Sequence, residues 1–210
     1  DQLIKTMTST STATKNTITL KGSTEIVTEF FGYSINSILY QRGIYPPESF
    51  ARVNKYGLTM LVTTDEGLSM YLSQVLSQLG EWLMGGSVQK LVLVITSVDT
   101  GTVLERWVFD VDTDADTVHD GKTHEKPEKE IMGEIQAIIR QITASVTFLP
   151  ILSEPCTFDL LVYADNEVDV PLSWEESDPK YIANSSEVRL RSFTTKVHKV
   201  EAMVAYKSDD

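Results

Sequence analysis

Apolar residues recur at steps of three and four in three stretches of the chain, which is the spacing of one helical face. The first stretch follows Ser23, which we expect to cap the helix, and Gly43 ends it. The second follows Thr63 and Glu66, which have capping-box spacing, and the third ends at Pro150. Three helices are therefore predicted. Their apolar stripes are Val27, Phe31, Ile35, Ile38 and Leu39; Leu68, Leu72, Val75, Leu79 and Trp82; and Ile131, Ile135, Ile138, Ile142, Val146 and Leu149.

Runs rich in β-branched residues lie between and after these helices and predict strands. Residues 88–95 form a buried strand, and the Asp99-Thr100-Gly101 turn leads into a second strand at 102–111. Alternation places Val103 on the same face as Trp107. Further extended stretches are 58–64, 158–164, 188–200 and 201–207.

The order of these elements predicts the fold class. The predicted order of helices and strands contains few βαβ crossovers, and no helical period appears after Asp165. We therefore expect an α+β domain with three helices packed on a largely antiparallel sheet, followed by an extended C-terminal tail.

Composition narrows the possible functions. The 210 residues include 18 Lys+Arg and 30 Asp+Glu, a formal charge of −12. An acidic chain of this kind argues against binding nucleic acid through its phosphates. No apolar run is long enough for a membrane span, and the polar head lacks the apolar core of a signal peptide. The single cysteine, Cys156, suits a reducing compartment such as the cytosol or nucleus.

Motifs for catalysis are few, and no phosphate-binding loop, nucleophile elbow or HExxH motif is present. Alternating carboxylates from Asp112 to Asp120 resemble a calcium loop. Thr117 stands where that loop needs glycine, however, and Thr123 where it needs glutamate. We expect a solvated acidic loop. A metal-dependent hydrolase using these carboxylates and His124 is the alternative from another functional class.

The other reactive side chains give no clear catalytic pattern. His119 and His124 are five residues apart, which is not the spacing of two ligands on a helical face, so surface histidines are expected. Cys156 has no surrounding catalytic signature and is expected to be a packed thiol. His198 has no partner that the sequence identifies.

The third helix carries polar and aromatic residues away from its isoleucine stripe. On a helical wheel Arg140 and Thr147 fall nearly opposite the stripe, and Gln141 and Phe148 lie to one side. Two interpretations remain. Either the helix frays before Pro150 with Phe148 under a loop, or this face is a protein-binding surface anchored by an aromatic residue and an arginine.

The tail also allows two interpretations. Apolar and basic residues alternate over 188–191. This pattern is typical of an edge strand with outward charges that prevent aggregation. It also fits a strand pair that can join or leave the main sheet.

Several long words of the sequence are similar to one family. They are ITLKGSTEIVTEFF, NSILYQRGIYPPESF, KYGLTMLVTTD, SVQKLVLVI, VLERWVFD, IRQITASVTFLP, WEES, EVRLRSFTTKVHKV and MVAYK. In this order, from Ile18 to Lys207, they resemble the HORMA-domain family, and within it the spindle-checkpoint proteins. A translesion DNA polymerase accessory subunit of the same family is the alternative, and the words resemble it less.

The resemblance implies a conformational switch without catalysis or cofactor. Residues 165–206 would form a mobile safety belt that, in a closed form, wraps a partner peptide added to the sheet as a strand. The implied partners are the kinetochore protein Mad-one, the coactivator of the anaphase-promoting complex, other mitotic checkpoint complex subunits and a second copy of the chain. Neither nucleic acid nor membrane is a partner. The implied locations are the nucleus, kinetochores and cytoplasm.

The resemblance also implies domain bounds and site residues. The domain would cover 18–207, after a disordered head at 1–17 and before a tail at 208–210. The residues with implied roles are Trp82, Trp107, Leu160, Val162 and Tyr206 for peptide binding; Arg140, Gln141, Thr147 and Phe148 for dimerisation; and Leu20 for the preference between forms.

Overall fold

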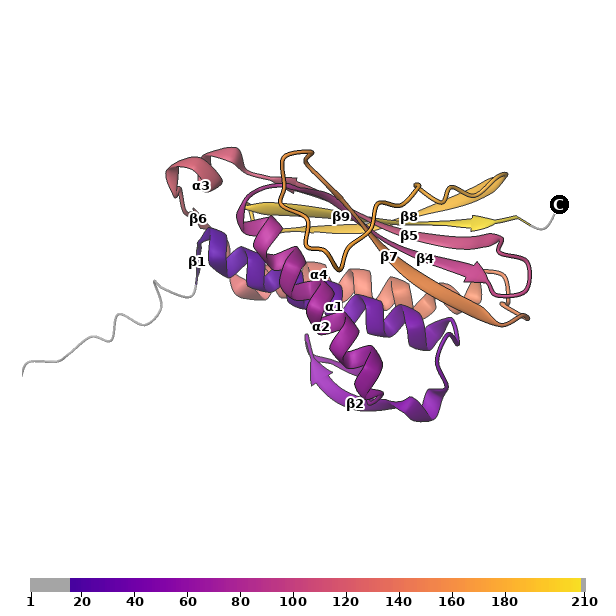
Figure 1. Cartoon of the computed structure of the whole chain (residues 1–210). Helices are drawn as coiled ribbons and strands as arrows, with labels where there is room; N and C mark the ends of the chain where they lie inside the picture. The colour runs from indigo at the N-terminus through magenta and orange to yellow at the C-terminus, as the bar shows by residue number, and fades with distance from the viewer. Residues whose placement is uncertain (1–15, 209–210) are drawn as a thin grey trace, which may run out of the picture.

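Three long helices cover one face of a five-stranded sheet (Figure 1). The computed structural model describes residues 16–208, so most of the expected head at 1–17 lies outside the described residues. The long helices are α1 (Leu20–Gln41), α2 (Glu66–Met84) and α4 (Glu128–Ala144). None of the helices in the described part is both long and apolar enough to cross a membrane.

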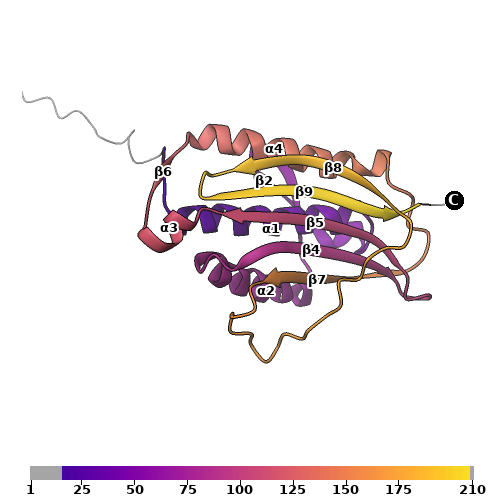
Figure 2. The same ribbon diagram turned by 90° about the horizontal axis from the view of Figure 1, so that it is seen from above.

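The sheet is antiparallel throughout, as expected (Figure 2). Its order is β7-β4-β5-β9-β8, which places β7 and β8 at opposite edges. The strands are β4 (Val88–Ser97), β5 (Val103–Thr113), β7 (Cys156–Ala164), β8 (Ser185–Thr194) and β9 (His198–Lys207).

Smaller elements complete the described fold. They are β1 (Thr17–Ile18), paired with β6 (His124–Glu125); the hairpin of β2 (Phe50–Lys55) and β3 (Leu58–Thr63); α3 (Ala115–Asp120); and the 3-10 turns Pro47–Ser49 and Ser145–Thr147. The acidic loop is therefore partly ordered. Asp114 caps α3 by accepting a hydrogen bond from the Thr117 N–H at 3.1 Å.

The core lies between the helices and the inner face of the sheet. Phe30 of α1 packs edge-on against Phe109 of β5 and Phe193 of β8, with ring centroids 5.8 and 4.7 Å apart. All three rings are buried. Such contacts join segments that are far apart in the sequence, so the C-terminal strands share one core with the first helix.

Two expected helix starts were wrong. Thr19, rather than Ser23, caps α1 by accepting from the Gly22 N–H at 3.0 Å. Ser23 is instead buried inside the helix. Asp65 caps α2 by accepting from the Leu68 N–H at 2.7 Å. In both cases a nearby residue also carries a side-chain oxygen that can accept from the free backbone N–H groups. Sequence spacing alone therefore did not show which of the candidate residues is the cap.

Two expected burial positions were also wrong. Val146 is 48% exposed because the chain tightens into a 3-10 turn after α4, whereas Leu149, the last residue of the expected stripe, is buried. Val103 lies on the opposite face from Trp107, because the register shifts between Ile95 and Thr96 of β4. A bulge of this kind reverses the side of every residue beyond it.

Candidate functional site

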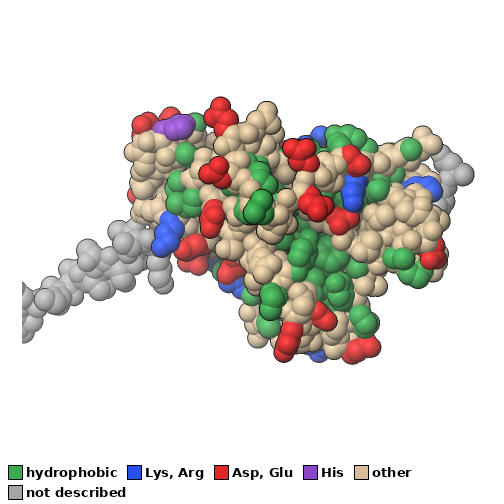
Figure 3. Space-filling model, viewed as in Figure 1, with side chains coloured by type: hydrophobic (Ala, Val, Ile, Leu, Met, Phe, Trp, Pro, Cys, Tyr) green, Lys and Arg blue, Asp and Glu red, His purple; other side chains and the backbone are tan. Residues whose placement is uncertain are grey.

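The outer edge of β7 is an edge of the five-stranded sheet, and two cavities border this strand. Among the strands that the structure describes, β7 pairs only with β4. Its other edge therefore carries backbone N–H and C=O groups that could pair with a further strand. Hydrophobic side chains gather on this face of the molecule, over α2 and β7 (Figure 3).

Residues 165–184, here called the crossing segment, border this edge. The segment contains neither helix nor strand and connects β7 to β8 at the far side of the sheet (Figure 2). A groove of about 420 Å³ lies between it and the second half of β7. The apolar lining consists of Trp82, Leu160, Leu161, Val162, Tyr163, Ala164, Val168, Val170, Trp174 and Pro179.

Two tryptophans attach the crossing segment to α2. The Trp82 and Trp174 rings meet edge-to-face with centroids 5.0 Å apart. The Trp82 indole N–H also donates to the Asp169 carbonyl at 3.3 Å. At the start of the segment, the Gln89 amide donates to the Asp165 carboxylate at 2.9 Å. The groove wall is therefore held in place by both aromatic and polar contacts.

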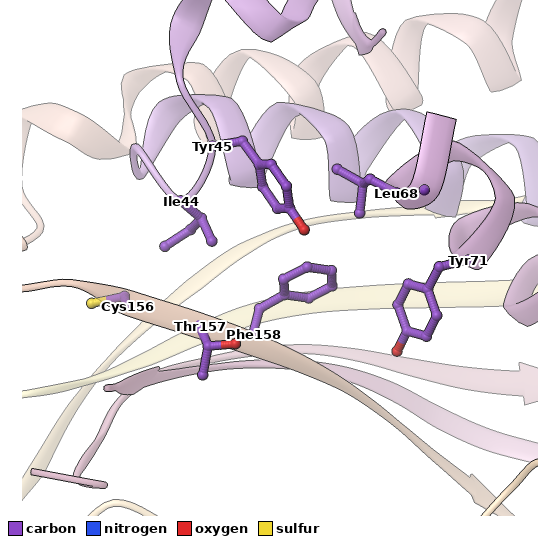
Figure 4. Close-up of a pocket in the computed structure, with 8 residues that line it drawn as sticks. Ile44, Tyr45, Leu68, Tyr71, Cys156, Thr157 and Phe158 are labelled. Carbon is purple, nitrogen blue, oxygen red and sulfur yellow. The ribbon is translucent and has the colours of Figure 1, made fainter. Parts of the chain in front are cut away.

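A second cavity of about 330 Å³ lies beside the first half of β7 (Figure 4). The Phe158 ring lies between Tyr45 and Tyr71, with centroids 6.2 and 6.0 Å away, and Leu68 and Ile44 complete the apolar wall. Burial raises the pKa of the Tyr71 hydroxyl, and the nearby Asp159 carboxylate adds to this effect. Both cavities border β7, so a strand laid along its edge would pass each of them.

The structure brings together three of the five residues expected to bind peptide. Trp82, Leu160 and Val162 line the groove at the β7 edge. Trp107 is completely buried in β5, where its indole N–H donates to the Glu105 carboxylate at 3.1 Å. Tyr206 is on β9, which β4 and β5 separate from β7.

The residues expected at a dimer surface lie on one exposed side of α4 and the turn after it. Arg140 and Thr147 are exposed, and Phe148 is 40% exposed, so the aromatic ring is not covered by a loop. Gln141 is half-buried, and its side-chain oxygen accepts a hydrogen bond from the Arg191 N–H of β8 at 2.6 Å. The exposure of Arg140 and Phe148 is as expected, and their role in association remains a prediction.

Leu20 and the basic tail occupy well-defined positions. Leu20 is the first residue of α1 and packs half-buried against the core. β8 is an edge strand, as expected, and Arg189 and Arg191 point to solvent. Whether this strand leaves the sheet remains a prediction.

The histidines and the acidic loop have partners of their own. His124 Nε2 lies 3.0 Å from the Asp114 carboxylate. Hydrogen bonds from the Thr117 hydroxyl and from His124 lower the pKa of Asp114 to about 2. His119 is exposed, as expected, but the expectation that His124 lies on the surface was wrong, because it packs half-buried against Asp114 and Thr117. Across residues 16–208, the side chains of His, Cys, Asp and Glu form no group of three or more that could hold a metal ion.

His198 is buried and Cys156 is half-buried, and both contribute to packing. His198, for which the sequence identified no partner, is completely buried, and its Nδ1 lies 2.7 Å from the Ser23 hydroxyl. Cys156 packs against the core, as expected, and its thiol donates to the Glu154 carbonyl at 3.3 Å. Burial, and then the charge of Glu154, raise the pKa of this thiol, so it stays protonated at neutral pH.

One residue of the sequence indicates this groove, although the sequence patterns above do not predict it. Trp174 lies in a polar, helix-free tail, where a large aromatic residue is unusual. A half-buried tryptophan in such a segment has to pack on another surface. That surface is Trp82, and finding it required the tertiary structure.

Comparison with known proteins identifies the fold. Residues 23–198 match the HORMA domain family. The chain is 68% identical over 195 residues to a mitotic spindle assembly checkpoint protein, MAD2A of Dictyostelium discoideum, covering 93% of this chain and 96% of the relative. It is 60% identical over 190 residues to MAD2A of Homo sapiens, covering 90% and 93%.

A solved structure and a more distant relative support the same assignment. A chain in a crystal structure of the mitotic checkpoint complex is similar with a TM-score of 0.81 and 50% identity, covering 89% of this chain and 99% of that chain. A DNA polymerase zeta processivity subunit of Schizosaccharomyces pombe is 28% identical, covering 75% of this chain and 76% of the relative. The similarity to the checkpoint proteins is therefore much greater than the similarity to this polymerase subunit.

Proposed function

Since this chain belongs to the HORMA domain family, and within it to the mitotic spindle checkpoint proteins, we propose that its closed form clamps an extended partner peptide against the free edge of β7. It acts as a non-enzymatic adaptor. The observation that carries the proposal is the groove between β7 and the crossing segment, which combines an unpaired strand edge with apolar walls.

The chemistry of this groove suits strand addition. Backbone groups of β7 would bind the peptide backbone irrespective of its sequence. Apolar peptide side chains on one face would then contact Leu160 and Val162, with Trp82 and Trp174 at the far wall. The cavity beside Phe158 would receive a further side chain from the same peptide. Affinity would come from the backbone bonds and specificity from these pockets.

The positions of the C-terminal strands favour a closed form. β9 pairs with β5 and β8 lies outside it, so the crossing segment spans the whole sheet from β7. We propose that residues 165–206, within a domain at 18–207, move as the belt. In this proposal Leu20 influences which form is preferred.

We propose the partners from the family membership. The captured peptides would come from the kinetochore protein Mad-one and from the coactivator of the anaphase-promoting complex, in assemblies with other mitotic checkpoint complex subunits. Capture of the coactivator would delay anaphase until kinetochores attach, which implies work at kinetochores, in the nucleus and in the cytoplasm. The surface of Arg140, Gln141, Thr147 and Phe148 would join an open and a closed copy.

Peptide capture can be tested with a labelled peptide panel. Overlapping fluorescent peptides from the coactivator of Dictyostelium discoideum would be titrated by polarisation, and the tightest peptide kept as the probe. Trp174→Ala removes the aromatic wall, so we expect the probe to dissociate about tenfold faster or more.

Leu172→Ala is the matched control, because Leu172 lies on the same segment and is fully exposed to solvent. This variant should retain the dissociation rate of the parent protein. Failure of every peptide to bind the parent protein would refute the proposal. Equal effects of the two substitutions would show that the groove is not the binding site.

A further inference from the structure

The crossing segment encloses the free edge of β7. It continues from the last residue of β7 at one end and enters β8 at the other, and these strands are opposite edges of the sheet. A chain lying on the β7 edge would therefore lie inside a loop of protein. Such a chain can leave only lengthwise, or after the crossing segment lifts from the sheet.

The segment crosses the face of the sheet opposite the helices (Figures 1 and 2). The apolar residues on that face, Val92, Val94 and Val108, form a small cluster separate from the main core. Arg106 lies on β5 at the same alternation as Val108 and is only 7% exposed. The crossing segment thus passes over a face that carries a small apolar cluster and the nearly buried Arg106.

Two contacts of different chemistry fasten the segment where it crosses. The Lys180 ammonium lies 2.8 Å from the Asp159 carboxylate of β7. One residue further, the Tyr181 ring lies 4.7 Å from the Arg106 guanidinium of β5. Arg106 also donates to the Tyr163 hydroxyl at 3.3 Å, which fixes the cation beneath the ring.

The backbone at this point is held in an unusual conformation. Lys180 has φ of 50°, in the left-handed region that non-glycine residues seldom adopt. Its N–H donates to the Asp178 side-chain oxygen at 2.9 Å, which closes a local turn. This turn directs the ammonium of Lys180 toward β7 while the next residue reaches β5.

We propose that Lys180–Asp159 and Tyr181–Arg106 form a latch that sets how long a captured peptide remains bound. The effect of the latch on peptide lifetime rests on the proposed peptide capture. The attachment of the crossing segment by the latch is independent of that proposal. None of the four residues lines either cavity beside β7. The latch therefore acts on the exit of the peptide rather than on its contacts.

The two contacts differ in how they respond to salt. The Lys180 and Asp159 side chains are 31% and 48% exposed, so salt screens their attraction and the pair alone contributes little. The Arg106 cation is nearly buried although the Tyr181 ring above it is 71% exposed, so salt screens this contact less than the ion pair. We expect Asp159→Asn alone to raise the peptide dissociation rate about threefold, and Asp159→Asn with Tyr181→Ala about tenfold.

The first experiment uses the peptide-free protein. Nitrogen-15 relaxation would give backbone order parameters for residues 178–183 in the parent protein and the double variant. We expect these values to fall from about 0.85 to below about 0.6 when both contacts are removed. Unchanged order parameters would overturn the latch whether or not any peptide binds.

The second experiment measures release of the probe peptide from a preformed complex after excess unlabelled peptide is added. Asp110→Asn is the matched control, because Asp110 forms an ion pair with Lys90 on the same sheet, at 3.3 Å, without the crossing segment. This control should release peptide at the parent rate. Exchange of the two charges, Asp159→Lys with Lys180→Asp, should restore slow release, and high salt should reduce the effect of Asp159→Asn.

Each outcome has a distinct meaning. Loss of peptide binding in the parent protein would refute the proposed function and leave the relaxation result to decide the latch. Normal release from the double variant, together with a mobile crossing segment, would overturn the role of the latch in peptide lifetime. If Asp110→Asn accelerated peptide release as much as Asp159→Asn, the effect would come from the change in net charge rather than from the latch.

Discussion

At the residue scale, His198 joins the C-terminal strands to the first helix. Its Nδ1 contacts the Ser23 hydroxyl, which in turn lies 2.5 Å from the Thr195 hydroxyl. All three side chains are completely buried. The contact ties the turn between β8 and β9 to α1, so the charge on His198 affects how firmly the tail is attached.

Burial lowers the pKa of His198 from the ordinary 6.5 to about 4. The unfolded chain therefore binds a proton more readily than the folded protein between these two values. The neutral imidazole contributes its full stability above about pH 6.5, and this contribution falls as the pH drops toward 4. The total loss is about 3 kcal/mol, at 1.36 kcal/mol for each unit of pKa.

Urea unfolding at several pH values tests this prediction, with His198→Asn as the comparison because asparagine can occupy the Nδ1 position without titrating. The difference in unfolding free energy between the parent and His198→Asn should be constant above pH 6.5 and shrink below it. If this difference in unfolding free energy stayed constant down to pH 4, His198 would bind a proton as readily in the folded protein as in the unfolded chain, and the prediction would be wrong.

At the scale of elements, α4 has a buried side and an exposed side. Its buried stripe continues to Ile142, which is completely buried, whereas Arg140 and Phe148 are exposed. The exposed side also reaches β8, because Gln141 accepts a hydrogen bond from the backbone of Arg191. The proposed dimer surface is therefore in contact with the strand that belongs to the belt.

Substitutions on the exposed side should separate association from folding. Arg140→Glu and Phe148→Ala should each weaken the open–closed dimer by about 2 kcal/mol or more, because central arginine and aromatic residues dominate interfaces. Peptide capture should survive, since it uses the β7 edge. Sedimentation of mixed forms measures the dimer, and thermal unfolding measures stability.

Ile142→Ala is the matched comparison on the buried side of the same helix. It should cost about 2–5 kcal/mol of unfolding free energy, while Phe148→Ala should cost far less. A dimer of undiminished strength, or a large loss of stability from Phe148→Ala, would contradict the assignment of this side to an interface.

At the scale of the whole molecule, movement of the proposed belt requires breaking a central part of the sheet. β9 lies between β5 and β8 and pairs with β5 from Thr113 to Glu105. Val200 and Val204 of β9 are completely buried. Release of the belt therefore breaks a ladder of hydrogen bonds and uncovers part of the core, which is slower than loop motion.

We therefore predict two forms that interconvert over minutes to hours. Fresh protein should separate on anion exchange into two peaks, and each isolated peak should slowly regenerate the other. Added peptide should shift the population toward the closed form, because it binds that form alone. A single peak at all temperatures, unaffected by peptide, would argue against a slow switch.

Local sequence patterns determined much of the architecture. The stripes of α1, α2 and most of α4, and the hairpin of β4 and β5, depend on periodicity and turn residues within each segment. The same local reasoning separated Arg140 and Phe148 from the core, because a helical wheel needs only the sequence of one helix. The acidic composition, and the sequence segments that resemble the HORMA-domain family, completed the assignment of fold and function.

The tertiary structure alone decided features that join distant segments. Side chains compete for the same cap, so Thr19 could displace Ser23, which then became a buried partner of His198. The groove requires Trp82 and Trp174 to meet, and the proposed latch requires Lys180 of the crossing segment to reach Asp159 of β7. Such contacts carry no periodicity in the sequence, because they depend on strand order and on the path of an irregular segment through space.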